Sequence, residues 1–152
     1  MRRVAWALFL SFAGVAWAAG GAGLYGGWPE VFGIQFVTEQ GWRMSVGLAP
    51  ETGEVTRYSV AVSLDLVLAA GTVYSDDGAM VDVAYYAGAG ATGSLLRADP
   101  EVNGHAMLGL EAYFTAMKSV GFFGELQLGQ RLWFAPLSTR PLLGLRVGFS
   151  FR

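Results

Sequence analysis

The charged residues of this chain are few, and eight of them occupy the same place in a two-residue alternation of apolar and polar side chains. They are Arg43, Arg57, Asp65, Asp82, Glu111, Glu125, Arg131 and Arg146. Four of these residues are basic and four are acidic. Charges in a confined interior have to be paired, since an unpaired buried charge costs several kcal/mol. The balance predicts an internal ion-pair network, and ordinary surface charges are the alternative.

A catalytic arrangement can be drawn around His105, the only histidine, with Glu111 and Ser119 as its partners. A hydrolytic triad needs the nucleophile within hydrogen-bond reach of its base, and His105 has no serine beside it in the pattern. Glu111 and Glu125 could also act as an acid–base pair. Arg131 and Arg146 nearby favour a structural network instead. We therefore expect no catalytic residue and no enzyme activity.

Two further motifs could bind a cofactor or a metal ion. Residues 88–93 match the glycine fingerprint of dinucleotide sites by letter. That site needs a helix N-terminus after the glycines, whereas these glycines continue a strand pattern, so a glycine row facing the inside of a sheet is favoured. Asp76-Asp77-Gly78 lacks the further ligands of a calcium loop and indicates a turn. With no cysteine in the chain, we expect no cofactor and no metal site.

The elements that must position these residues are strands. Between Val55 and Ala70 every second residue is apolar, and the interleaved residues are small, polar or charged. Successive side chains of a strand point to opposite faces, so this pattern predicts one apolar and one polar face. The apolar set is Tyr58, Val60, Val62, Leu64, Leu66 and Leu68. The same split recurs at 32–37, 42–48, 81–90, 105–114, 122–134 and 143–151, and a weak strand at 21–27 makes eight.

Turn chemistry separates these segments at 28–30, 40–41, 50–53, 75–78, 99–100, 117–119 and 135–139. Short connections favour an antiparallel meander, because parallel strands need crossovers of a dozen or more residues. The predicted fold is all-β: a closed antiparallel up-and-down barrel of about eight strands. No helical segment is expected after residue 18.

The composition indicates which face of this barrel meets which solvent. Hydrophobic residues make up 53% of the chain and charged residues 14%, against about 25% in soluble domains. Eight strands leave room inside only for side chains, which suits the small polar set better than the bulky apolar set. We therefore expect the apolar face to point outward into lipid, with Trp28, Trp42, Tyr58, Phe134 and Phe151 near the membrane interfaces.

The first residues carry the pattern of an export signal. Arg2 and Arg3 form a positive start, Val4–Val15 an apolar core, and Ala16-Trp17-Ala18 a site for cleavage after Ala18. An uncleaved membrane anchor is the alternative. The predicted organisation is a signal peptide at 1–18 followed by a transmembrane barrel domain at 19–152. Without Arg2 and Arg3 the chain keeps 8 of its 10 basic residues against 12 acidic ones, so nucleic acid is not an expected partner.

The barrel pattern resembles the small eight-stranded outer-membrane barrels of the OmpA/OmpX-like class. The last segment, Leu143–Phe151, looks like the C-terminal assembly signal of that class, although Arg152 follows its final aromatic residue. Residues 23–29 are similar to the first strand of such barrels. The resemblance implies the outer membrane of a two-membrane bacterium, with outer-membrane lipid and the barrel-assembly machinery as partners. No catalytic residue is carried over.

Three functions remain open from the sequence. The favoured one is an outer-membrane barrel with a structural or surface-interaction role, an unknown surface ligand and an interior plugged by side chains. A periplasmic lipocalin-like barrel would bind an apolar ligand and would need the apolar face inside. An outer-membrane lipid-modifying enzyme would depend on His105.

Overall fold

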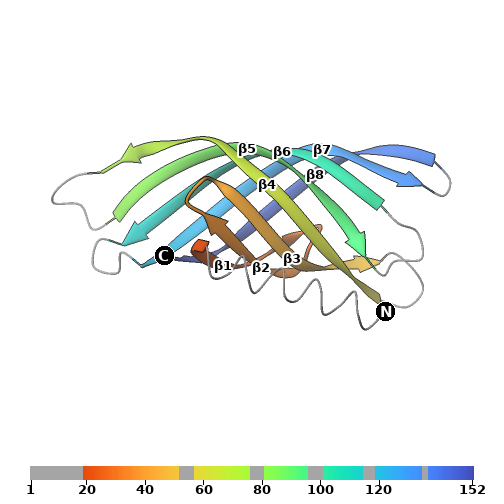
Figure 1. The fold of residues 1–152 in the computed structure, drawn as a ribbon, viewed down its shortest axis with the longest axis horizontal. Coiled ribbons are helices and arrows are strands. Elements are labelled where there is room, and N and C mark those ends of the chain that lie inside the picture. Colours follow the sequence, from red (N-terminus) through yellow and green to blue (C-terminus); the bar gives the residue numbers. More distant parts are fainter. Residues whose placement is uncertain (1–18, 52–56, 76–80, 96–100, 115–118, 135–136) are drawn as a thin grey trace.

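The computed structural model describes residues 19–51, 57–75, 81–95, 101–114, 119–134 and 137–152, and these form a closed barrel of eight strands (Figure 1). The strands are β1 (Ala19–Trp28), β2 (Phe32–Thr38), β3 (Trp42–Glu51), β4 (Arg57–Tyr74), β5 (Val81–Leu95), β6 (Glu101–Phe114), β7 (Val120–Phe134) and β8 (Leu137–Phe151). Among these residues there is no helix of the length and apolar character needed to cross a membrane. The expected signal peptide at 1–18 and Asp76-Asp77-Gly78 lie outside the described residues.

Each strand pairs antiparallel with the next strand in the chain, and β8 returns to pair with β1. The closing ladder runs from Ala22 opposite Phe151 to Trp28 opposite Leu145. The prediction of an all-β, closed, antiparallel barrel of eight strands is therefore confirmed. Because β1 pairs with β2 on one side and β8 on the other, the first and last strands of the sheet leave no free edge where they meet.

The two faces of the barrel follow the predicted alternation. In β6 the residues from Glu101 to Leu110 are buried and exposed in strict turn. Ser59, Ala61, Ser63 and Asp65 of β4 are buried, while Leu64 between them is 48% exposed. The small and polar residues therefore face the interior of the barrel, and the bulky apolar residues face outward.

The alternation is interrupted in β4 by a bulge that the sequence pattern did not predict. Val67 lies opposite Gly88, but the next aligned pair is Ala69 with Ala87, so Leu68 is an extra residue without a partner in β5. A bulge shifts the two-residue alternation by one. Leu68 itself is exposed like Leu64, as predicted, and the change of parity begins with Ala69, which lies opposite Ala87.

The connections between strands also refine the prediction. Gly41 closes the turn between β2 and β3 with φ of 84°, a left-handed conformation that favours glycine. The turn expected at 135–139 is shorter than predicted, because β8 begins at Leu137 and pairs with Phe134 of β7. Residues 137–139 are thus part of a strand. All three are exposed, including the apolar Leu137.

Inward glycines give space to inward tyrosine rings on the neighbouring strand. Tyr25 lies opposite Gly33, and Tyr86 lies opposite Gly109. A Cβ atom built on either glycine would collide with the facing tyrosine ring. These rings therefore lie against the inner wall where the opposite strand has no side chain, which is how large side chains fit inside a narrow barrel.

We predict that Gly109→Ala lowers the free energy of unfolding by about 1–3 kcal/mol, because the added methyl group overpacks the site of the Tyr86 ring. Gly104→Ala, in the same strand but on the outward face, is the matched control. No atom lies within 4 Å of a Cβ at Gly104, so this change should be neutral. Denaturant unfolding of both variants in detergent micelles measures the difference, and equal stabilities would contradict the packing argument.

Candidate functional site

The candidate site is a cluster of buried charged and polar side chains in the interior of the barrel. Arg43 of β3 and Asp65 of β4 lie directly opposite each other, and Arg43 Nε and Nη2 donate to Asp65 Oδ2 at 3.2 and 3.1 Å. Arg43 also forms an ion pair with Glu125 of β7 and donates to Met107 Sδ at 2.7 Å. Because Arg43 is 3% exposed and both carboxylates are fully buried, each charge depends on the others for its neutralisation.

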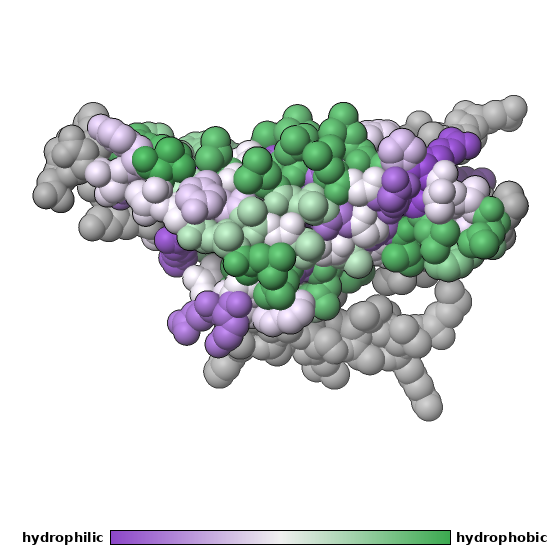
Figure 2. All heavy atoms as spheres, turned by 90° about the horizontal axis from the view of Figure 1, so that it is seen from above, coloured by the Kyte–Doolittle hydropathy of each residue, from purple (hydrophilic) through white to green (hydrophobic). Residues whose placement is uncertain are grey.

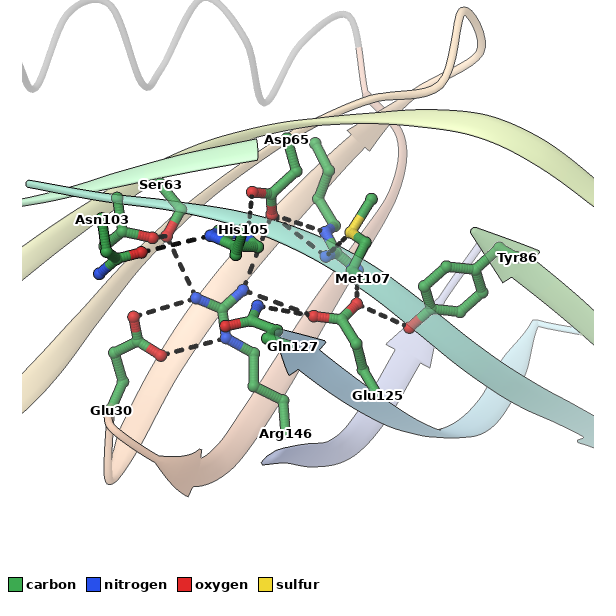
Figure 3. A network of polar contacts seen from close by, with 12 residues as sticks. Glu30, Ser63, Asp65, Tyr86, Asn103, His105, Met107, Glu125, Gln127 and Arg146 are labelled. Carbon is green, nitrogen blue, oxygen red and sulfur yellow. Dashed lines mark hydrogen bonds and ion pairs between the residues drawn. The ribbon is translucent and has the colours of Figure 1, made fainter. Parts of the chain in front are cut away.

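A second arginine, Arg146 of β8, joins the other side of the cluster (Figure 3). Its Nε and Nη2 donate to the two carboxylate oxygens of Glu30 at 3.1 and 3.0 Å, a bidentate arrangement. Nη2 also donates to Ser63 Oγ at 3.1 Å. Nη1 lies 3.7 Å from Asp65 and 3.9 Å from Glu125, so Arg146 shares both carboxylates with Arg43.

Two inward glycines allow side chains from non-adjacent strands to meet. Gly90 of β5 lies opposite both Asp65 of β4 and His105 of β6, and His105 Nε2 approaches Asp65 Oδ1 to 3.1 Å across it. Any Cβ atom at Gly90 would collide with Asp65 Oδ1. Gly109 of β6 has the same role for the Tyr86 hydroxyl, which donates to Glu125 at 3.0 Å. These glycines connect β4 with β6 and β5 with β7.

Neutral polar side chains complete the cluster. Gln127 Nε2 donates to Glu125 at 2.8 Å, and His105 Nδ1 lies 3.3 Å from the Asn103 side-chain oxygen. Ser63 and Thr92 are joined by a hydroxyl hydrogen bond of 2.7 Å. Such bonds lower the cost of burying the charges, because they satisfy part of the remaining hydrogen-bonding capacity of the cluster. Asp65 Oδ1 and Arg146 Nη1 have no hydrogen-bond partner among the described residues and make ionic contacts only.

Four of the eight residues predicted for the network come together here, namely Arg43, Asp65, Glu125 and Arg146. The other four lie elsewhere, so the expectation of a single network of eight needs correction. Arg57, at the start of β4, is exposed, and Glu111 pairs with Arg152 at 3.5 Å near one end of the barrel.

The remaining two predicted residues also lie away from the cluster. Asp82 lines a separate cavity with Thr72 and Arg152. Arg131 lies opposite Arg140 in the ladder of β7 and β8, and its Nε has no hydrogen-bond partner among the described residues. All four share the inward position of the alternation but lie nearer the strand ends. Alternation predicts whether a side chain faces inward, but it does not predict the height of that residue along the barrel axis. This height decides which charges come into contact.

Sequence reasoning missed Glu30 and did not assign His105 to the network. Glu30 belongs to the turn between β1 and β2, where no alternation predicts a direction, and its partner Arg146 is 116 residues away. Its only signal was a charge in a short turn. His105 has an inward position in the alternation. The signal that its side chain could contact Asp65 two strands away is Gly90, which lies opposite it and has no side chain.

The arrangement is that of a bonded structural cluster and does not resemble the triad drawn from the sequence. His105 is 5% exposed and contacts Asn103 and Asp65. Glu111 is six residues further along β6, about 20 Å away at 3.4 Å per residue, and Ser119 lies in the turn beyond the end of that strand. Within the described part of the chain no group of three or more histidine or acidic side chains could hold a metal ion.

The interior also does not meet the requirement of the lipocalin-like alternative. The largest fully buried side chains of the described residues are Arg146, Gln127, Glu30, Glu125 and Asp65. An apolar ligand site is lined mainly by apolar and aromatic side chains. The centre of this barrel is therefore the wrong environment for an apolar ligand.

Comparison with known proteins assigns no family to the chain. No family model matches the chain, and neither a curated protein nor a solved structure is similar enough to count as a match.

We predict that Arg43→Met destabilises the barrel by about 3–5 kcal/mol, because Asp65 and Glu125 lose the arginine that they share. The matched control is Arg57→Met, which removes the same charge from an exposed position of β4. The control should change stability by less than about 0.5 kcal/mol. Urea unfolding in micelles, followed by tryptophan fluorescence, measures both variants. Equal losses would show that the buried cluster does not hold the interior together.

Proposed function

We propose that this protein is a small outer-membrane β-barrel with a structural or surface-interaction role and an interior plugged by side chains. The observation that carries the proposal is the distribution of charge. All charged residues on the described strands occupy inward positions of the alternation, and none occupies an outward position. They are Arg43, Glu51, Arg57, Asp65, Asp82, Glu101, Glu111, Glu125, Arg131, Arg140 and Arg146. A surface in water normally shows the opposite distribution.

The outward face carries exposed apolar side chains from every strand. Leu108 of β6, Leu128 of β7 and Leu143 of β8 are 58%, 54% and 63% exposed, whereas Arg146 is 0% exposed. Figure 2 shows hydrophobic side chains gathered over the middle of the visible face. Soluble monomers rarely expose apolar patches larger than a few hundred Å². In a hydrocarbon environment exposed apolar side chains carry no free-energy cost, whereas an outward charge would be unfavourable.

The lengths of the strands suit a bilayer. A transmembrane strand needs about 9–11 residues, and seven of the eight strands have 10 or more. β2, with 7 residues, is the exception. Closure matters equally, because lipid offers no partner to an unpaired strand edge and only a closed barrel satisfies its own backbone.

Aromatic side chains at the strand ends support the same placement. Trp28, Tyr58 and Phe134 lie at the ends of strands on one side of the barrel, and Trp42 and Phe151 lie on the other. All five are between 41% and 57% exposed. Aromatic girdles at both interfaces are typical of membrane barrels.

The buried cluster supports a plugged interior rather than a pore. Arg43, Glu125 and Arg146 reach across from β3, β7 and β8 and meet in the same cluster. An eight-stranded barrel has an interior only wide enough for side chains. The role proposed for the cluster is therefore to fill and fix the barrel, with no catalytic step.

Export and insertion complete the proposal. Residues 1–18 would direct the chain across the inner membrane, and the barrel-assembly machinery would insert it. β8 ends in outward Val147, Phe149 and Phe151, the apolar and aromatic alternation that resembles an assembly signal.

Cell fractionation tests the membrane proposal. We expect the protein to sediment with outer membranes, to require detergent for release, and to run faster on gels when it is not boiled, since the closed barrel stays folded in detergent. Its release into the soluble periplasmic fraction without detergent would overturn the proposal.

Planar-bilayer recording tests the plugged interior separately. We expect the purified barrel to insert with little stable conductance, because paired charges from three strands occupy its cross-section. A porin of known conductance, purified in the same detergent, is the positive control. Large, stable and reproducible conductance steps would show that the interior is open.

A further inference from the structure

A cavity opens at the end of the barrel where β1 begins and β8 ends (Figure 1). Its volume is about 420 Å³, near the lower limit of the range found for small-molecule sites. Gly21 of β1, Gly41 of the turn between β2 and β3, and Phe151 of β8 form part of its lining. Arg43 and Tyr86 line it as well, and both belong to the central cluster. The cavity therefore ends at the cluster and is a pocket rather than a channel.

The pocket owes part of its space to Gly23 of β1. Gly23 lies opposite Gln35 of β2 on one side and opposite Ser150 of β8 on the other. A Cβ atom at Gly23 would lie only 2.9 Å from Gln35 Cγ and Nε2. Because neighbouring strands are about 4.8 Å apart, the backbones of β2 and β8 are about 10 Å apart here. Gln35 and Ser150 thus flank an inner position that has no side chain.

Two buried polar groups beside Gly23 lack partners. Gln35 is 4% exposed and Ser150 is 9% exposed, and both line the pocket. Among the described residues neither Gln35 Oε1 nor Ser150 Oγ has a hydrogen-bond partner. A buried polar atom without a partner costs free energy, and a ligand that supplies the missing bond recovers it. The two groups are therefore the place in the pocket where a hydrogen-bonding ligand gains most.

Aromatic side chains form another part of the same pocket. Tyr113 of β6 and Phe123 of β7 line it and are 8% and 5% exposed. A Cβ atom at Gly121 would come within 3 Å of both the Tyr113 ring and Ser150 Oγ, so the ring and the hydroxyl lie close together. The face of an aromatic ring is partly negative and attracts the C–H groups of a ligand. The pocket thus combines hydrogen-bonding groups with surfaces for C–H groups.

The charged side chains of the pocket favour a neutral ligand. Among the described lining residues these are Glu39, Arg43, Glu111 and Arg152. Arg43 is bound to two carboxylates of the cluster, and Glu111 pairs with Arg152 at 3.5 Å. Glu39 is exposed and can be solvated by water. An ionic ligand would have to compete with these existing pairs, whereas a neutral ligand leaves them intact.

We propose that this pocket binds a neutral sugar of about one ring. Gln35 and Ser150 hydrogen-bond its hydroxyl groups, and Tyr113 and Phe123 pack against its C–H groups. A sugar ring carries hydroxyl groups on opposite edges, so one molecule can reach both sides of Gly23. An apolar ligand would leave Gln35 Oε1 without a donor. This inference goes beyond the proposed membrane role and does not require it, because it rests on the register of β1, β2 and β8.

Nuclear magnetic resonance of the isotopically labelled full protein tests the proposal in micelles of a detergent without a sugar headgroup. The probes are the methyl glycosides of glucose, galactose and mannose, and N-acetylglucosamine. We expect at least one of them to shift the side-chain amide signal of Gln35 in a saturable way. The signal of Gln130, an exposed glutamine of β7, is the internal control and should not move. Glucuronate and glucosamine, which are charged, should bind at least about tenfold more weakly.

A first pair of variants tests the hydrogen bond. Gln35→Leu should weaken the best-binding sugar about tenfold, whereas Gln130→Leu should leave its affinity unchanged. The backbone amide signal of Gly23 reports binding in both variants. Since Gln35 Oε1 has no partner among the described residues, we expect Gln35→Leu not to lower the midpoint of urea unfolding without sugar. A purely structural role for Gln35 would lower that midpoint.

A second pair of variants tests the aromatic surface. Phe123→Leu keeps an apolar side chain but removes the inward ring, and it should weaken the sugar about fivefold. Phe122→Leu, at the adjacent outward position that is 45% exposed, should have no effect. Gel mobility without boiling checks that every variant is folded. If Gln35→Leu does not fold, Ser150→Ala replaces it, with Ser138→Ala at an exposed serine of β8 as its control.

Three results would overturn the proposal. None of the neutral sugars could shift the Gln35 signal. Glucuronate or glucosamine could bind as tightly as the best neutral sugar. Finally, the inward variants could bind sugar as well as their matched controls. None of these results bears on membrane fractionation, so this inference and the proposed function fail independently.

Discussion

The interior of this barrel depends on two buried arginines. Arg43 and Arg146 share Asp65 and Glu125, and Arg146 also holds Glu30 of the turn between β1 and β2. Each charge is tolerable in the buried interior only because the others are present. The cluster thus joins strands that the backbone ladder does not connect directly, and it ties a turn to the wall.

The small inward residues are what make this cluster possible. Gly90 leaves space for the contact between Asp65 and His105. Gly109 leaves space for the Tyr86 ring, whose hydroxyl donates to Glu125. A side chain at either position would fill the space through which these groups meet. The sequence therefore places most of its bulky apolar residues on the outward face, because a narrow eight-stranded interior holds few large side chains beside the charged cluster.

The sequence predicts the architecture well because alternation is a local property. Eight strands, their inward and outward residues and the antiparallel order follow from spacing two residues apart. The bulge at Leu68 escaped prediction because an extra residue in one strand is defined by the strand opposite. Glu30 was missed because a turn has no periodicity. The division of eight charges into a central cluster and outlying residues depends on register, which only the paired structure contains.

The ladder between β1 and β8 also has a consequence for how the chain folds. It joins residues 22–28 with residues 145–151, the longest sequence separation of any strand pair, while every other ladder joins neighbours along the chain. Forming it costs the most loop entropy, so it belongs to the late, slow part of folding. Arg146 lies within this last strand, opposite Gly27. Arg146 also lies opposite Glu125 in the ladder of β7 and β8, so that contact does not require closure. Its bidentate bond to Glu30, which follows β1, forms only once β8 meets β1, so completion of the cylinder and docking of the β1–β2 turn are a single step.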